Sequence, residues 1–154
     1  CIAVDPWFIV NKTPDLARIV RTAREVNDGK PQWVISKVQE AVQEVVAKTG
    51  KAANEVKVVC YGLAFKPNID DLRESPALMI TNKLAALYPN QVLAVEPNIA
   101  NDHFETKQNF ELISCDAAKD MADVAVILVD HNEFKAGLSF NNDAVIVDTK
   151  GIVR

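Results

Sequence analysis

Residues 56–88 decide the fold, and they read VKVVCYGLAFKPNIDDLRESPALMITNKLAALY. Residues 56–61 are a short apolar run rich in valine, which is typical of a buried strand. Ser75 can cap a helix and Pro76 suits its first turn, so the pattern predicts a helix over residues 76–88. A buried strand followed by a helix is the first part of a β–α–β unit.

The same alternation continues toward the carboxyl end of the chain. Strand-like runs occupy residues 91–95, 111–114, 124–129 and 144–147, and residues 117–121 form a short helical segment. Strands with valine and isoleucine on both faces indicate a parallel sheet whose two faces are covered. We therefore predict an α/β, Rossmann-like, doubly wound domain over residues 51–154, preceded by long amphipathic helices.

Residues 1–50 have a different pattern. Pro6 interrupts the apolar start of the chain, and a helical stripe begins near Thr13 with Leu16 and Ile19 among its apolar positions. The turn-like sequence at residues 28–31 predicts either two helices or one kinked helix ending near Gly50. Such a stripe is expected to bury its apolar face against another helix or another subunit.

Composition excludes several classes of protein. The chain has 154 residues and a net charge of -4, which disfavours binding to nucleic acid. Its apolar runs are strand-sized, far below the roughly 20 residues of a membrane-spanning helix, so we expect no membrane association. The number of cysteines is odd, which favours a reducing cytoplasm, and the cysteines do not have the spacing of metal ligands. The first residue is cysteine, and we expect the chain to be a fragment.

In open α/β sheets, ligands bind beyond the carboxyl ends of the strands. The loop over residues 62–75 lacks the glycine-rich and Walker patterns, so this domain is not predicted to be the principal dinucleotide binder. Lys66 and Arg73 precede a helix, where two cations would suit phosphate oxygens. The alternative is a solvated turn with local ion pairs.

The other loops carry weaker signals. Glu96 stands where Rossmann folds place an acid on a ribose, but without the glycine pattern a structural role is favoured. His131 suits a general base, a phosphate contact or a capping network. Lys150 follows the last strand and could lie beside Lys66 at the edge of the sheet formed by the carboxyl ends of the strands.

The cysteines differ in their surroundings. Cys60 lies inside a predicted strand and Cys115 at a strand end, where an inert thiol is expected. Cys1 has Asp5 four residues on. A cysteine nucleophile needs a stabilised thiolate or a neighbouring base. The local pattern alone favours an incidental thiol.

Three motifs together resemble the UDP-glucose/GDP-mannose dehydrogenase family: CIAVDPWFI at residues 1–9, REVND at residues 24–28 and GLAFKPNIDDLRESP at residues 62–76. The similarity continues through residues 130–134 and 147–151. The resemblance implies an NAD-dependent enzyme in which an amino-terminal Rossmann domain binds NAD. It also implies central helices that form a homodimer, here residues 13–49, and a carboxy-terminal domain that helps bind a UDP-sugar. On this basis residues 1–50 are the end of the catalytic segment with the dimer helices.

The resemblance also assigns roles to individual residues. It implies that Cys1 is the catalytic nucleophile and that Asp5 positions water or handles protons. It implies that Phe65, Lys66 and Lys150 contact the UDP-sugar and that Arg73 reaches the NAD.

One departure bears on the sugar. The glucose-specific branch has a Pro-Lys pair before the aspartate, where this chain has Ala3 and Val4, which favours the N-acetylmannosamine branch.

The implied reaction oxidises the sugar C6 alcohol twice, through a thiohemiacetal and a thioester on Cys1, to the uronic acid. The chain by itself is expected to be inactive, since the glycine-rich NAD loop belongs to the amino-terminal part of the same enzyme. Two alternatives stay open: a non-catalytic α/β nucleotide-binding or interaction module, and a UDP-glucose 6-dehydrogenase.

Overall fold

The computed structural model describes residues 4–99 and 108–153. Contacts within the chain group it into two units, Cys1–Trp33 and Val34–Arg154. The second unit thus begins inside a helix, whereas the sequence pattern alone suggested a division after residue 50. Each unit is described separately.

The first unit contains the helix α1, Asp5–Lys12, and the beginning of α2, Arg18–Thr49. Pro6 was expected to interrupt regular structure, and this expectation is wrong. Pro6 lies in the first turn of α1, where a helix has no use for the missing N–H group. The α1 helix ends at Lys12, and the Thr13 hydroxyl then donates to the Ile9 carbonyl over 3.1 Å.

The long helix α2 runs without interruption from Arg18 to Thr49. It starts at Arg18 rather than near Thr13, and the alternative of two separate helices is wrong. Pro31 lies inside it and cannot donate to the carbonyl four residues earlier, so one helical hydrogen bond is missing there. The part of α2 after Pro31 is stabilised by packing, because its apolar residues from Val34 to Val45 belong to the core of the second unit.

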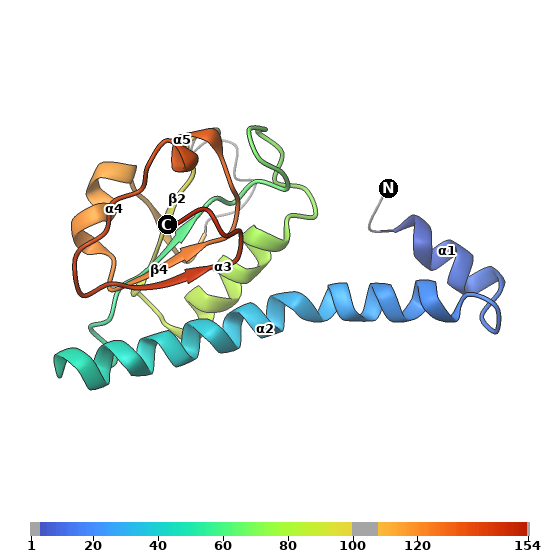
Figure 1. Cartoon of the computed structure of the whole chain (residues 1–154), viewed down its shortest axis with the longest axis horizontal. Helices are drawn as coiled ribbons and strands as arrows, with labels where there is room; N and C mark the ends of the chain where they lie inside the picture. Colours follow the sequence, from blue (N-terminus) through green and yellow to red (C-terminus); the bar gives the residue numbers. More distant parts are fainter. Residues whose placement is uncertain (1–3, 100–107, 154) are drawn as a thin grey trace. The chain divides into compact units, whose positions relative to one another are not determined.

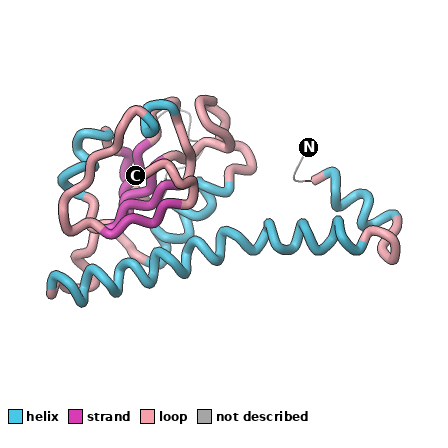
Figure 2. The backbone as a smooth tube through the Cα atoms, in the orientation of Figure 1, coloured by secondary structure: helices cyan, strands magenta, loops and turns pink. Residues whose placement is uncertain are grey.

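The second unit is built on one five-stranded parallel sheet (Figures 1 and 2). Its strands are β1 (Val58–Tyr61), β2 (Val92–Val95), β3 (Glu111–Leu112), β4 (Val124–Ile127) and β5 (Val145–Asp148). Their order across the sheet is β3-β2-β1-β4-β5, and every neighbouring pair is parallel. The predicted α/β doubly wound fold is confirmed.

Helices cover both faces of this sheet (Figure 1). Val58 and Cys60 of β1 face α2 and α3, Pro76–Leu87, in one apolar cluster. Val59 and Tyr61 face the other way, in a cluster with α4, Cys115–Met121, and α5, Asn132–Lys135. Because the side chains of a strand alternate between faces, a strand covered on both sides is apolar throughout, as the sequence of β1 predicted.

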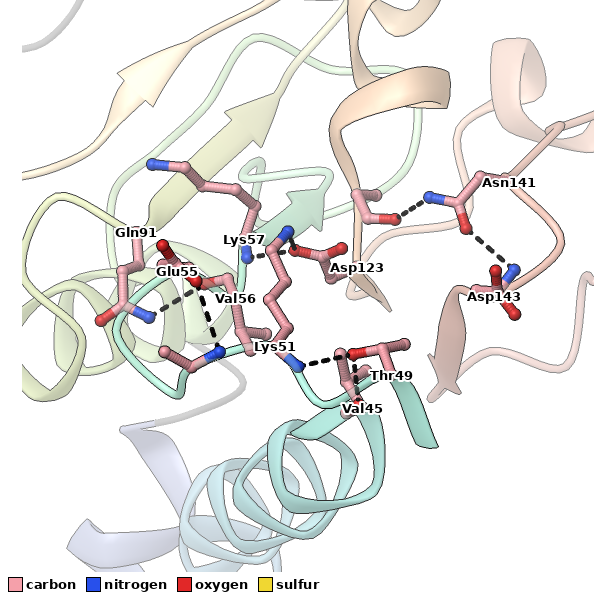
Figure 3. A network of polar contacts seen from close by, with 12 residues as sticks. Val45, Thr49, Lys51, Glu55, Val56, Lys57, Gln91, Asp123, Asn141 and Asp143 are labelled. Carbon is pink, nitrogen blue, oxygen red and sulfur yellow. Dashed lines mark hydrogen bonds and ion pairs between the residues drawn. The ribbon is translucent and has the colours of Figure 1, made fainter. Parts of the chain in front are cut away.

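A polar network closes the amino-terminal edge of the sheet, as Figure 3 shows. One oxygen of Asp123, which precedes β4, accepts from the Lys51 ammonium over 2.6 Å and from the Lys57 backbone N–H over 2.7 Å. The Gln91 amide donates to the carbonyls of Ala53 and Val56. These contacts join the end of α2 to the starts of β1, β2 and β4.

Among the described residues, no helix is both long enough and apolar enough to cross a lipid bilayer.

Candidate functional site

The carboxyl ends of β1 and β4 lie side by side at the centre of the sheet. From β1 the chain passes to β2 on one side, and from β4 it passes to β5 on the other. This divergence is the topological switch point, where open α/β sheets bind ligands. The loops after β1, β2, β4 and β5 therefore form the candidate site.

Gly62 allows the loop after β1 and the loop after β4 to approach each other closely. Its φ is +87°, and a Cβ placed there would lie 2.4 Å from Cβ of Val129. Such a separation is far inside van der Waals contact, so only glycine fits between the ends of β1 and β4. This glycine serves close packing of the backbone at the switch point.

Glu96, just after β2, is buried beneath the first loop. Its Oε2 accepts from the backbone N–H groups of Leu63, over 2.6 Å, and Ala64, over 3.0 Å. Burial by itself would raise the pKa of this carboxyl, but hydrogen bonds from His131 and from backbone N–H groups outweigh it, and the pKa lies below its ordinary value. Glu96 is thus an ionised carboxylate, and both of its oxygens form hydrogen bonds within the protein.

His131, just after β4, completes the same network. Its side chain has no exposed surface, and Nε2 lies 3.2 Å from Oε2 of Glu96. Nδ1 accepts from the backbone N–H of Asn68 over 3.0 Å. Because Nδ1 is used as an acceptor, we assign the ring proton to Nε2, which donates to Glu96. Of the roles open for His131, the structure favours the capping network, since a ring buried in this way has no access to a substrate.

Asn68 is anchored twice to the loop after β4. Its backbone N–H donates to His131, and its side-chain oxygen accepts from the backbone N–H of Asn132 over 2.9 Å. Asn68 has a φ of 61°, a left-handed conformation that asparagine tolerates better than most residues. The loop over residues 62–75 is thus fixed near its start and in its middle.

Phe65 and Lys66 lie between these anchor points. The Phe65 backbone N–H donates to the carbonyl of Asp71 over 2.8 Å, which folds the loop back on itself. Lys66 is exposed, and its ammonium lies 5.7 Å from the centre of the Phe65 ring. Both side chains are therefore presented at the carboxyl edge by a loop that is held from below.

Arg73 lies farther along the same loop and is 87% exposed. Its guanidinium contacts both carboxylate oxygens of Asp71, over 3.0 and 2.8 Å. The side-chain and backbone hydrogen bonds from Arg73 lower the pKa of Asp71 to about 2. The exposed side of the Arg73 guanidinium is open to solvent, while its contact with Asp71 is bidentate.

Lys150 follows β5 in a turn organised by Asp148. One oxygen of Asp148 accepts from the backbone N–H groups of Lys150 and Gly151, and the other accepts from that of Val153. Burial would raise the pKa of Asp148, but these backbone donors lower it below its ordinary value. The Lys150 side chain is exposed at the same edge of the sheet as Lys66.

Replacing Asp148 with asparagine should destabilise the chain near pH 7, because an amide cannot accept from donors on both sides. The folded-state pKa of Asp148 lies below its unfolded value, so its contribution is present above about pH 4 and is lost as the pH falls through the folded pKa. The gap in free energy of unfolding between wild type and Asp148→Asn should therefore shrink in acid. Urea unfolding at several pH values measures this gap. A gap that does not change with pH would contradict the role given to the carboxylate.

The structure does not test the roles expected for the two catalytic residues, Cys1 and Asp5. Cys1 lies outside the described residues. Asp5 opens α1 and is exposed, in the other structural unit. Their roles stay predictions. Cys60 is buried, and burial raises the pKa of its thiol to about 12, while Cys115 is exposed at the start of α4.

The described residues do not fit the principal site for a dinucleotide. Glu96 follows β2, where an acid could bind a ribose, but its carboxylate already forms hydrogen bonds with Leu63, Ala64 and His131. The turn after β1 has no run of glycines to admit a pyrophosphate. Nor do residues 4–99 and 108–153 contain a cluster of His, Cys, Asp or Glu able to hold a metal ion.

A cavity of about 610 Å³ lies beside the last loop and is lined by Phe134, Lys135, Gly137, Leu138, Gly151, Ile152 and Val153. It adjoins Lys150 in sequence, but neither Phe65 nor Lys66 lines it. Phe65, Lys66 and Lys150 thus lie on loops at the same edge of the sheet but do not line this cavity.

Sequence reasoning missed the way in which Glu96, His131 and Asn68 act together. A signal was present, because an acid and a histidine each follow a strand predicted to lie in the same parallel sheet. Their pairing depends on the strand order, which the sequence pattern did not provide.

The fold and the switch-point loops define a Rossmann-like α/β domain of the nucleotide-binding type. Residues 59–154 match the UDP-binding domain of the UDP-glucose/GDP-mannose dehydrogenase family. The chain belongs to that family, as its sequence motifs indicated.

Relatives of known name agree with this membership. The chain is 54% identical over its whole length to a UDP-N-acetyl-D-mannosamine dehydrogenase of Salmonella typhi, and 51% identical to that of Escherichia coli K12. It spans 37% of the length of each. The solved UDP-N-acetyl-mannosamine dehydrogenase Cap5O from Staphylococcus aureus superposes with a TM-score of 0.72 and 34% identity, over 100% of this chain and 34% of that one.

Proposed function

We propose that this chain is the carboxy-terminal part of an NAD-dependent UDP-N-acetyl-D-mannosamine 6-dehydrogenase. The observation that carries the proposal is the 54% identity to a dehydrogenase of that name over the entire chain. The short span relative to such enzymes is consistent with a part that acts together with an amino-terminal NAD domain.

In this proposal the carboxyl edge of the sheet binds the UDP-sugar through Phe65, Lys66 and Lys150. Two exposed lysines on loops that follow β1 and β5 offer cationic donors to diphosphate oxygens, and Phe65 offers an apolar ring. Arg73 reaches a phosphate of the NAD. The exposure of the Arg73 side chain supports this role, because its guanidinium is accessible to a second anion.

The chemistry assigned to this chain belongs to Cys1 and Asp5. The C6 alcohol of the sugar is first oxidised to an aldehyde, and the Cys1 thiolate adds to the aldehyde carbon to form a thiohemiacetal. Oxidation of the C–H bond at that carbon gives a thioester. Water, positioned by Asp5, then cleaves the C–S bond to release the uronic acid and regenerate the thiol. NAD, bound mainly by the amino-terminal part of the enzyme and contacted from this chain by Arg73, would accept the hydride in both oxidations.

We expect the 154-residue chain by itself to be inactive and to bind UDP weakly, because the proposed site lacks the contacts of the amino-terminal part. Isothermal calorimetry with UDP measures the affinity. A dissociation constant below about 1 μM would show that the chain holds a nearly complete site. That result would contradict the shared-site proposal.

We propose further that residues 13–49 form a homodimer. Leu16, Ile19 and Val26 are 87, 85 and 72% exposed, and Ile19 and Val26 are seven residues apart on one side of α2. The double variant Ile19→Glu, Val26→Glu should therefore be monomeric when its mass is measured by light scattering. Leu87→Glu is the control, since Leu87 is an exposed apolar residue of α3. Equal masses for the double variant and the wild type would exclude this interface.

The proposed activity is tested by assaying the full-length protein that carries this chain with UDP-N-acetylmannosamine and with UDP-glucose. The proposal predicts a higher kcat/KM for UDP-N-acetylmannosamine, with production of the uronic acid. Preference for UDP-glucose would assign the chain to that branch of the family. Absence of NAD reduction with either sugar would favour a non-catalytic module.

A further inference from the structure

We propose that Glu96 and His131 are positioning residues that hold the Phe65–Lys66 segment in its binding geometry. The inference deepens the function proposed above and rests on it for the ligand. Neither side chain has exposed surface, so neither is placed to touch a substrate. Both act through the loop over residues 62–75.

The first arm of this support is Glu96. Its carboxylate is the shared acceptor for two successive backbone N–H groups, those of Leu63 and Ala64, directly before Phe65. Its other oxygen accepts from the backbone N–H of Asn98 over 2.9 Å, so the acid is itself fixed by the loop after β2. A charged acceptor with this many donors holds the backbone more firmly than a neutral one would.

The second arm is His131, which reaches the loop on the far side of Lys66. Its Nδ1 accepts from the Asn68 backbone N–H, and its Nε2 donates to Glu96. The imidazole therefore links the two arms. Asn132, the next residue, adds a third contact by donating its backbone N–H to the Asn68 side chain. Residues 65–67 thus form a short span fixed at both ends.

This arrangement makes the two nitrogens of His131 separable by mutation. In His131→Asn, the amide oxygen can take the place of Nδ1 and accept from Asn68, while the contact with Glu96 is lost. In His131→Gln, the amide nitrogen can take the place of Nε2 and donate to Glu96, while the contacts of Nδ1 with the Asn68 backbone and the Asn98 side chain are lost. Both variants remove the ring, so cavity formation alone does not distinguish them.

The test uses full-length enzyme and measures KM and kcat for the UDP-sugar. His131→Gln should raise KM about tenfold, because a loop that is no longer held at Asn68 must be ordered when the ligand binds, and that ordering weakens binding. His131→Asn should raise KM less, and kcat should change little in both because the support acts on binding. Val59→Ala, in the core of β1, controls for general destabilisation and should leave KM unchanged.

Asn68→Gly provides a second probe that preserves folding. Glycine tolerates the left-handed φ and keeps the N–H donor to His131, but it removes the oxygen that accepts from Asn132. It should raise KM with little effect on kcat. Unchanged KM in both Asn68→Gly and His131→Gln would overturn the inference.

A readout that is independent of activity separates this inference from the proposed function. In the 154-residue chain, His131→Gln should speed hydrogen exchange of the Asn68 amide, and His131→Asn should largely preserve its protection. If the wild-type enzyme oxidises no UDP-sugar but this exchange pattern is found, the proposed function fails while the loop support stands. Equal exchange of the Asn68 amide in both variants and the wild type would refute the support itself.

Discussion

Replacing Cys1 with serine should abolish formation of the uronic acid by the full-length enzyme. Serine keeps the shape of the side chain but supplies no thiolate at neutral pH, so neither the thiohemiacetal nor the thioester forms. Loss of a nucleophile on which the covalent steps depend should lower kcat by at least about a thousandfold. The acid is measured by chromatography of the nucleotide-sugars after reaction with excess NAD.

Cys115→Ser is the matched control, because Cys115 is an exposed thiol elsewhere in the chain, at the start of α4. This variant should retain wild-type turnover. Normal acid formation by Cys1→Ser would refute the covalent role. Equal loss in both variants would mean that the effect does not come from one particular thiol.

Replacing Gly62 with alanine should have the largest effect on stability. The new Cβ would lie 2.4 Å from Cβ of Val129 and 3.0 Å from the backbone nitrogen of Val129. Residue 62 also has a φ of +87°, which alanine adopts only with strain. Left-handed strain costs about 1–2 kcal/mol and overpacking about 1–3 kcal/mol, so we expect a loss of roughly 2–5 kcal/mol in free energy of unfolding. Urea denaturation of the 154-residue chain measures it.

Gly50→Ala isolates the contribution of the close approach. Gly50 also has a positive φ, of +72°, but a Cβ there meets nothing within 4 Å. Its replacement should cost only the left-handed strain, about 1–2 kcal/mol. If the two alanine variants were equally stable, the contact between Gly62 and Val129 would not limit the approach of β1 and β4.

The sheet domain was predictable from the sequence because its strands are buried on both faces. Apolar runs such as Val58–Tyr61 and Val124–Ile127 admit few other structures once helices alternate with them. The amino-terminal region was less predictable. Proline usually interrupts a helix, but Pro6 lies in the first turn of α1, and Pro31 lies inside α2, whose following part is stabilised by packing.

The site was predictable only in part, for a physical reason. Lys66 and Lys150 each follow a predicted strand, and a parallel sheet places such residues at one edge. The support beneath them was not predictable, because the contact between Glu96 and His131 joins residues 35 positions apart. It depends on β1 lying between β2 and β4, an order that periodicity does not determine.

The amount of NADH formed per molecule of UDP-N-acetylmannosamine consumed by the full-length enzyme tests the central claim most directly. Two successive oxidations at C6 predict about two NADH per sugar, with the uronic acid as the only accumulating product. One NADH per sugar with an accumulating aldehyde, or no NADH at all, would contradict the assignment of this chain to a dehydrogenase that carries its substrate through a cysteine thioester.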